Sequence, residues 1–116
     1  MEAASAPFFE QGLRDRTYAG FLATDEQGRV VAGGGVILVA YQPHPLGPQP
    51  RRPFVVNMYT EPERRGQGLA RRLMARMIAW SREEGYVALF LHASDAGRPL
   101  YEELGFKPTN EMRLAL

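Results

Sequence analysis

Hydrophobic residues recur with two different periods along this chain. Residues 18–24 and 30–41 are rich in β-branched, aromatic and small apolar residues, and the polar stretch Asp25–Arg29 between them contains Gly28. Two such runs separated by a short polar turn predict a β-hairpin. From 69 to about 84 the apolar residues instead recur every three or four positions, as on one face of an amphipathic helix. The chain therefore predicts an α/β fold.

A loop and a third strand are expected between the hairpin and the helix. Residues 54–60 have a strand pattern, and five prolines and a glycine between 42 and 53 predict an exposed loop before them. The run Gly33–Gly35 interrupts the second strand, where glycine marks a bulge, a sharp twist or the close approach of a chain segment or ligand. The structural explanation of these glycines is favoured over the ligand.

The second half of the chain predicts a strand, a helix and a last strand. Residues 87–91 are continuously apolar, as in a buried parallel strand, and Gly85 fits the C-terminal cap of the helix before them. Ser94 or Asp95 can cap a second helix that ends near residue 104, and 112–116 can form a final strand. The expected order is ββ, β, α, β, α, β in a twisted mixed sheet flanked by helices.

Composition limits the classes of function. The 116 residues are 45% hydrophobic and 23% charged, which fits one globular domain, placed at 18–116 with 1–17 as a tail or short helix. Because the chain has no cysteine and only two isolated histidines, no metal site is expected. No apolar run is long enough to span a bilayer and the start lacks a signal-peptide pattern, so a cytoplasmic location is expected.

The charge pattern argues against nucleic acid as a partner. The formal net charge is only +1, although all but one of the 14 basic residues are arginine. Glutamates are interspersed among these arginines, so no continuous basic surface is expected.

The segment Arg65–Ala70 carries the clearest chemistry. It reads Arg-Gly-Gln-Gly-Leu-Ala and joins a predicted strand to the start of an amphipathic helix. The unpaired N–H groups and the positive dipole end of a helix start attract a phosphate, and small residues let that phosphate approach. The same glycines also suit a plain tight turn. A dinucleotide fingerprint is excluded because Arg71 stands where its third glycine belongs, and the P-loop lysine is absent.

This loop resembles that of the GNAT superfamily of N-acetyltransferases, whose (Arg/Gln)-x-x-Gly-x-(Gly/Ala) motif grips the pyrophosphate of coenzyme A. Arg65, Gly68 and Ala70 match that motif, and residues 100–106, Leu-Tyr-Glu-Glu-Leu-Gly-Phe, are similar to a second one near the end of these enzymes. The resemblance implies acetyl-CoA as cosubstrate. It also implies coenzyme contacts from the preceding strand end, the loop and two further residues: Met58, Tyr59, Thr60, Arg65, Gly66, Gln67, Gly68, Leu69, Ala70, Arg71 and Ser94.

The resemblance also implies a catalytic role for Tyr101, although a tyrosine on a helix is often a packing residue. Its hydroxyl would protonate the coenzyme thiolate as it leaves. Arg71 would reach the 3′-phosphate, and Ser94 would contact the pantetheine arm or simply cap a helix. The general base stays open between Glu61, His92, Glu111 and a water chain.

The N-terminal part departs from the family pattern, because members usually begin with a strand and two helices before the hairpin. Only 17 residues precede Tyr18 here, so the chain is expected to be either truncated or a compact variant. Such a variant would cover its sheet edge with its tail or as a homodimer. The expected function is acetyl transfer to a small-molecule or peptide amine. The alternative is a noncatalytic coenzyme A-binding or regulatory module.

Overall fold

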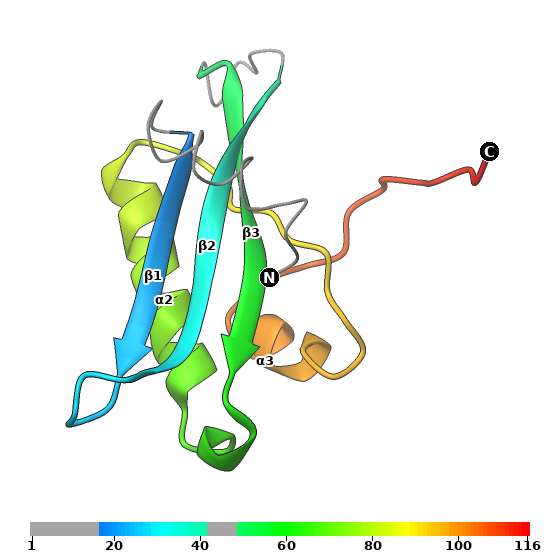
Figure 1. Cartoon of the computed structure of the whole chain (residues 1–116). Coiled ribbons are helices and arrows are strands. Elements are labelled where there is room, and N and C mark those ends of the chain that lie inside the picture. Colours follow the sequence, from blue (N-terminus) through cyan, green and yellow to red (C-terminus); the bar gives the residue numbers. More distant parts are fainter. Residues whose placement is uncertain (1–16, 42–48) are drawn as a thin grey trace.

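The structure is a computed structural model that describes residues 17–41 and 49–116. Three strands form an antiparallel sheet in the order β1–β2–β3, and three helical segments follow them in the chain (Figure 1). The elements are β1 Tyr18–Thr24, β2 Val30–Ala40, β3 Arg51–Thr60, the 3-10 helix η1 Pro62–Arg64, α2 Leu69–Glu83 and α3 Arg98–Glu103. The predicted hairpin, third strand and both helices are therefore confirmed.

The turn between β1 and β2 is built around Asp25. Its carboxylate accepts hydrogen bonds from the backbone N–H groups of Gln27 and Arg29, both at 2.9 Å, while Gly28 adopts φ +81°. An ion pair of 3.6 Å with Arg64 connects this turn to η1. The hydrogen bond from the N–H of Arg29 is the largest cause of a lowered Asp25 pKa, and the bond from Gln27 and the nearby Arg64 and Arg29 cations add to it.

A pH-dependent loss of stability is expected at Asp25. Because its pKa is lower in the folded chain than the usual value near 3.9, its stabilising effect is full above that value and is lost as pH falls through the folded pKa. Asp25→Asn should therefore lower the melting temperature at pH 7 by a few degrees, and by much less at about pH 2. Thermal unfolding by circular dichroism measures both values, and an equal loss at the two pH values would contradict this role.

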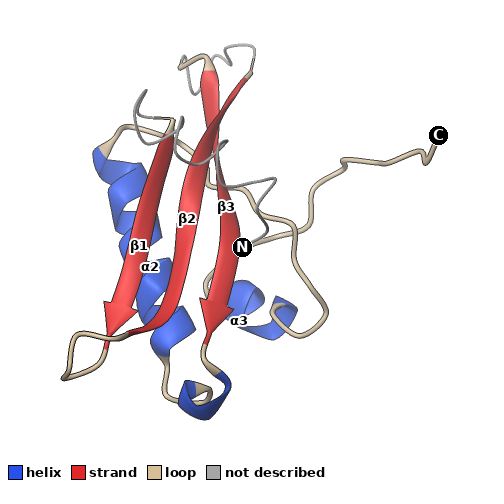
Figure 2. Cartoon of the chain, in the orientation of Figure 1, coloured by secondary structure: helices blue, strands red, loops and turns tan. Residues whose placement is uncertain are grey.

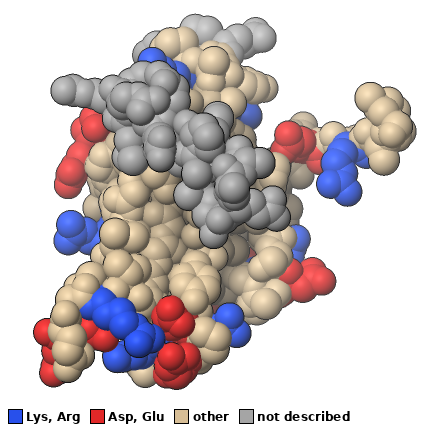
Figure 3. Space-filling view, viewed as in Figure 1, with Lys and Arg blue, Asp and Glu red and all other residues tan. Residues whose placement is uncertain are grey.

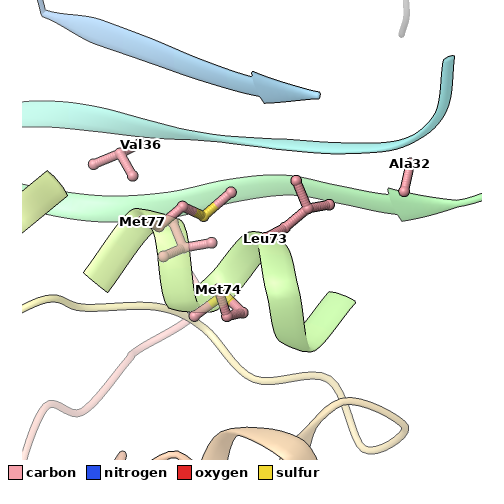
Figure 4. Packing of buried hydrophobic residues seen from close by; sticks show 6 residues of the cluster. Ala32, Val36, Leu73, Met74 and Met77 are labelled. Carbon is pink, nitrogen blue, oxygen red and sulfur yellow. The ribbon is translucent and has the colours of Figure 1, made fainter. Parts of the chain in front are cut away.

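Helix α2 covers one face of the sheet and makes the core with it (Figure 2). Its predicted apolar face is confirmed, since Leu73, Met74 and Met77 are buried and pack with Ala32 and Val36 of β2 (Figure 4). The helix begins after Gly68 at φ +78°. It ends before Gly85 at φ +86°, whose N–H donates to the carbonyl of Arg82. The predictions that Gly68 precedes the start of the helix and that Gly85 caps its end are therefore confirmed.

The predicted loop over 42–53 is wrong in its last part. Residues 42–48 lie outside the described part of the chain, whereas β3 already begins at Arg51 and contains the fully buried Pro53. The carbonyl of Pro53 faces away from β2 and accepts a hydrogen bond from Phe90. In a strand, the N–H and the carbonyl of one residue point to the same side. The N–H that Pro53 lacks would therefore point away from β2, so its absence costs no hydrogen bond between β2 and β3.

The two strands expected after α2 are also absent from the described structure. Only Phe90 bridges to β3, in the predicted parallel sense, through N–H to carbonyl bonds of 2.9 and 3.0 Å with Val55 and Pro53. Val87 is 66% exposed rather than buried. The stretch 112–116 projects away from the sheet (Figure 1), with Met112, Leu114 and Leu116 exposed. A strand pattern forms a strand only where a partner backbone lies alongside it. Residues 87–91 have such a partner at Phe90 alone, and 112–116 have none in the described structure.

Candidate functional site

A bulge interrupts β3 near its end. Gly35 pairs with Val56 and Gly33 with Tyr59, so Gly34 stands opposite the two residues Asn57 and Met58. Asn57 adopts φ +58°, a conformation that a non-glycine residue adopts only rarely. A Cβ on Gly34 would lie 2.4 Å from Met58 Sδ and 2.7 Å from Met77 Cε, so a side chain there would displace the ends of both methionines. The structural explanation of the glycine run is therefore the right one at this position.

A groove of about 740 Å³ opens beside this bulge. We call it the β3 groove. Among residues 17–41 and 49–116, four polar side chains line it, those of Asn57, His92, Ser94 and Tyr101. The strands β2 and β3 supply apolar lining, including Ile37, Val39, Phe54 and Val56. The groove brings the bulged end of β3 together with the predicted catalytic residue, although 44 residues separate Asn57 from Tyr101.

Tyr101 lies on α3, half-buried, and its ring packs edge-to-face against Phe106 with 5.9 Å between ring centroids. The part of the chain that the structure describes offers its hydroxyl no hydrogen-bond partner, and this hydroxyl is not buried. The hydroxyl is therefore accessible, and no protein group competes with a ligand for it, as the predicted role requires.

Gly97 places the Tyr101 ring, and sequence reasoning missed it. A Cβ at Gly97 would lie 2.8 Å from Tyr101 Cε2 and 3.2 Å from Ser94 Oγ. The N–H of Gly97 also donates to Ser94 Oγ at 3.1 Å. The N-cap of α3 is thus Gly97 rather than the predicted Ser94 or Asp95, because a turn over residues 95–97 precedes the helix and Ser94 bonds to that turn. Ser94 also lines the groove. The signal in the sequence was a glycine one helical turn before the tyrosine.

Gly97→Ala is expected to lower turnover by roughly ten- to a hundredfold, because the added methyl group pushes the Tyr101 ring out of position. Coenzyme affinity should stay near wild type. Gly20→Ala is the matched control, since its Cβ would meet the Tyr18 ring at an ordinary 3.6 Å. Steady-state kinetics on both variants measure the effect. Equal turnover in the two would contradict a role of Gly97 in positioning the Tyr101 ring.

The loop 65–70 has the open backbone that anion binding requires. Gly66 and Gly68 have φ values of +82° and +78°, and no atom lies within 4 Å of a Cβ built on either. The first helical N–H with a backbone acceptor is that of Arg72, which donates to Gly68 at 3.1 Å. The N–H groups of Leu69, Ala70 and Arg71 are therefore available, as at the start of other helices. The site thus fits a phosphate group.

The side chains around this loop have different surroundings. Gln67 is exposed, Leu69 packs partly on the core and Ala70 is half-buried. Arg65 donates from Nε to the carbonyl of Thr60 at 3.4 Å, which ties the loop to the end of β3. Arg71 forms an ion pair with Glu103 of α3, so its guanidinium already has a partner in the described structure.

The side chains of Met58 and Tyr59, at the end of β3, point in different directions. Met58 packs its side chain against the core, and Tyr59 is 51% exposed. Desolvation is the largest cause of a raised Tyr59 pKa, and the Glu61 carboxylate raises it further. The hydroxyl of Tyr59 therefore stays protonated at neutral pH.

The candidate bases lie in different places. His92 lines the β3 groove, stacks edge-to-face on Phe54 and approaches Glu111, with 3.8 Å between Nε2 and Oε2. Glu61 instead follows β3, and its N–H donates to Val31 at 2.8 Å. Of these three residues, His92 alone lines the groove. Glu111 does not line it but lies beside His92.

The described residues contain no group of three or more histidine, cysteine, aspartate or glutamate side chains that could hold a metal ion. The expectation of a metal-free site stays a prediction. Among residues 17–41 and 49–116, no helix has the length and apolar character that crossing a membrane requires.

Comparison with known proteins shows the family to which the chain belongs. The model of the acetyltransferase (GNAT) family matches residues 2–106, so the chain belongs to that family of acetyltransferases. This confirms the resemblance seen in the loop and in residues 100–106, and with it the fold. A comparison with curated proteins found no match.

Solved structures share the fold. A predicted acetyltransferase from Clostridium acetobutylicum, crystallised with acetyl-CoA, is 27% identical with a TM-score of 0.86, over 95% of this chain and 71% of that one. A GCN5-related N-acetyltransferase from Ralstonia eutropha JMP134 is 34% identical with a TM-score of 0.84, over 98% and 77%. The enzyme AAC(6')-Iy, solved with a coenzyme A bisubstrate analogue, shares the fold at 18% identity and a TM-score of 0.80, over 100% and 80%.

Proposed function

We propose that this chain is an N-acetyltransferase that moves the acetyl group of acetyl-CoA to a primary amine by direct attack. The observation that carries the proposal is the position of Tyr101, which lines the β3 groove and whose hydroxyl is hydrogen-bonded to no other group of the described structure. The open backbone of loop 65–70 supports it, because that loop follows directly on the strand that lines the groove. The acetyl-CoA in the related Clostridium structure supports the choice of cosubstrate.

Different residues would bind different parts of the coenzyme. The free N–H groups from Gly66 to Arg71 would hold the pyrophosphate, with the dipole of α2 adding to the attraction. Met58, Tyr59 and Thr60 would align the pantetheine arm through their backbone, and Ser94 would contact it from the opposite wall. Arg71 would leave Glu103 to reach the 3′-phosphate.

Tyr101 would then act as general acid. As the amine nitrogen bonds to the acetyl carbonyl carbon and the C–S bond breaks, the hydroxyl donates its proton to the leaving sulfur. The nitrogen releases one proton to a base, and Tyr101 regains its proton from solvent. His92 and a water chain both remain candidates for that base, because both have access to the groove.

A turnover assay separates this proposal from a noncatalytic coenzyme A-binding module. The chain contains no cysteine, so a thiol reagent added to enzyme, acetyl-CoA and an amine reports only the coenzyme thiol that is released. Thiol release that depends on both amine and enzyme is the expected result. Tight coenzyme binding with no release for any amine tested would favour the noncatalytic module.

A homodimer and a cytoplasmic location complete the proposal. The exposed Leu22 of the edge strand β1, Val30 at the start of β2, and Leu114 and Leu116 in the projecting stretch give a second copy apolar surface to cover. We expect sedimentation velocity at micromolar concentration to give the mass of two chains, and a single-chain mass would contradict it.

A further inference from the structure

The two ends of the β3 groove differ in chemistry. Asn57, Ser94 and Tyr101 lie at the end where the proposed acetyl transfer takes place. The other end is formed by the first half of β3 and the second half of β2, where Ile37 stands opposite Phe54. Residues directly opposite each other share one face of a sheet, so Ile37, Phe54 and Val56 lie on the face away from α2, which packs on Val36 and Val55 instead. This apolar end is the space left for the acceptor.

No acidic side chain of the described residues lines this groove. The carboxylate that comes near belongs to Glu111, and it is already beside His92 at 3.8 Å. Charged side chains gather instead at the far end of the sheet, around the β1–β2 turn and η1 (Figure 3). An acceptor with several ammonium groups would therefore have to bury charge without a partner, which is costly.

The positive charge of Arg52, near the apolar end, also disfavours an acceptor with several ammonium groups. Arg52 pairs with Val39 in the sheet register, which places it on the same face as the groove. Its guanidinium carbon lies 3.4 Å from the centre of the Tyr41 ring and 4.6 Å from that of Phe90. The two aromatic rings hold this positive charge beside Val39, which lines the apolar end of the groove, and there it repels a second cation.

We infer that the acceptor is a primary monoamine carried on an apolar alkyl or aryl body, and not a polyamine or a lysine-rich peptide. The inference rests on the proposed function and names its substrate class. The apolar body would lie on Ile37, Val39 and Phe54, with the single amine directed toward Tyr101. Each buried methylene adds to discrimination, so a longer alkylamine is a better substrate than a shorter one.

The test compares acceptors of the two classes. Hexylamine and 2-phenylethylamine represent apolar monoamines, butylamine a shorter one, and spermidine and a lysine-rich peptide the polycations. Wild-type chain with acetyl-CoA should give kcat/KM at least about tenfold higher for hexylamine than for spermidine, and a lower value for butylamine than for hexylamine. The coenzyme thiol released is the readout.

Two substitutions at one position separate charge from polarity. Val39→Asp places a carboxylate in the apolar end and should reduce the hexylamine-to-spermidine ratio of kcat/KM by at least about tenfold. Val39→Asn adds similar polarity without charge, so it should lower hexylamine turnover without a gain for spermidine. Leu22→Asp is the matched control, since Leu22 is exposed on the same sheet face but does not line the groove, and its ratio should equal that of wild type.

The outcomes distinguish this inference from the proposed function. A wild-type preference for spermidine or the peptide overturns the monoamine class, and so does a ratio that Val39→Asp leaves unchanged. Coenzyme that binds while every monoamine fails and a polycation is acetylated also counts against the acceptor class. Coenzyme that binds while no amine of either class is acetylated, or acetyl-CoA that does not bind at all, overturns the proposed function instead.

Discussion

Replacing Tyr101 by phenylalanine is expected to lower turnover by about 10²–10⁴, the usual effect of losing one general acid. The substitution keeps the ring and its edge-to-face contact with Phe106, and it removes only a hydroxyl that has no hydrogen-bond partner in the described structure. The melting temperature and the affinity for acetyl-CoA should therefore stay near wild type. Steady-state kinetics with calorimetric titration of the coenzyme measure both sides of this prediction.

Tyr86→Phe is the matched control for that experiment, because Tyr86 does not line the β3 groove. A Tyr101→Phe variant with wild-type turnover at neutral and alkaline pH would show that solvent protonates the leaving thiolate. A lowered melting temperature with unchanged turnover would make Tyr101 a packing residue.

Replacing Gly68 by aspartate is expected to weaken coenzyme binding by at least about a hundredfold. The carboxylate would stand where the free N–H groups of the α2 start receive the pyrophosphate, and each charge-assisted hydrogen bond lost is worth about 1.5–3 kcal/mol. Gly68→Asn has nearly the same size without the charge and should lose less. Calorimetric titration with acetyl-CoA gives the affinities, and circular dichroism checks the fold.

Gly28→Asp provides the control for backbone strain in that series. Gly28 has φ +81°, close to the +78° of Gly68, and both positions have open space around a Cβ. The same strain and the same charge are thus introduced far from the loop. If both aspartate variants bind the coenzyme as wild type does, the pyrophosphate lies elsewhere.

Local signals explain why much of this structure could be predicted from the sequence. Gly28 in the turn, Gly68 before α2 and Gly85 after it each sit at positive φ, which only neighbouring residues dictate. The loop motif and the stretch around Tyr101 were readable for the same reason, since each is a short run of chain whose chemistry depends on its own residues.

The features that sequence reasoning missed depend on partners far along the chain. The bulge at Asn57 follows from which residue of β2 faces which residue of β3, and single-sequence periodicity does not give that register. Residues 87–91 and 112–116 both have strand patterns. In the described structure, however, the first segment pairs with β3 only at Phe90, and the second pairs with no strand. The role of Gly97 depends on how the Tyr101 ring folds back over the start of α3.

We propose above that this chain binds acetyl-CoA through the loop that begins α2 and transfers its acetyl group. Thermal unfolding with and without millimolar acetyl-CoA and free coenzyme A tests it most directly, because a ligand that binds only the folded chain raises its melting temperature. The account predicts that both ligands raise it in the wild type and that Gly68→Asp abolishes the rise while Gly28→Asp keeps it. A wild-type melting temperature that neither ligand changes would contradict the account.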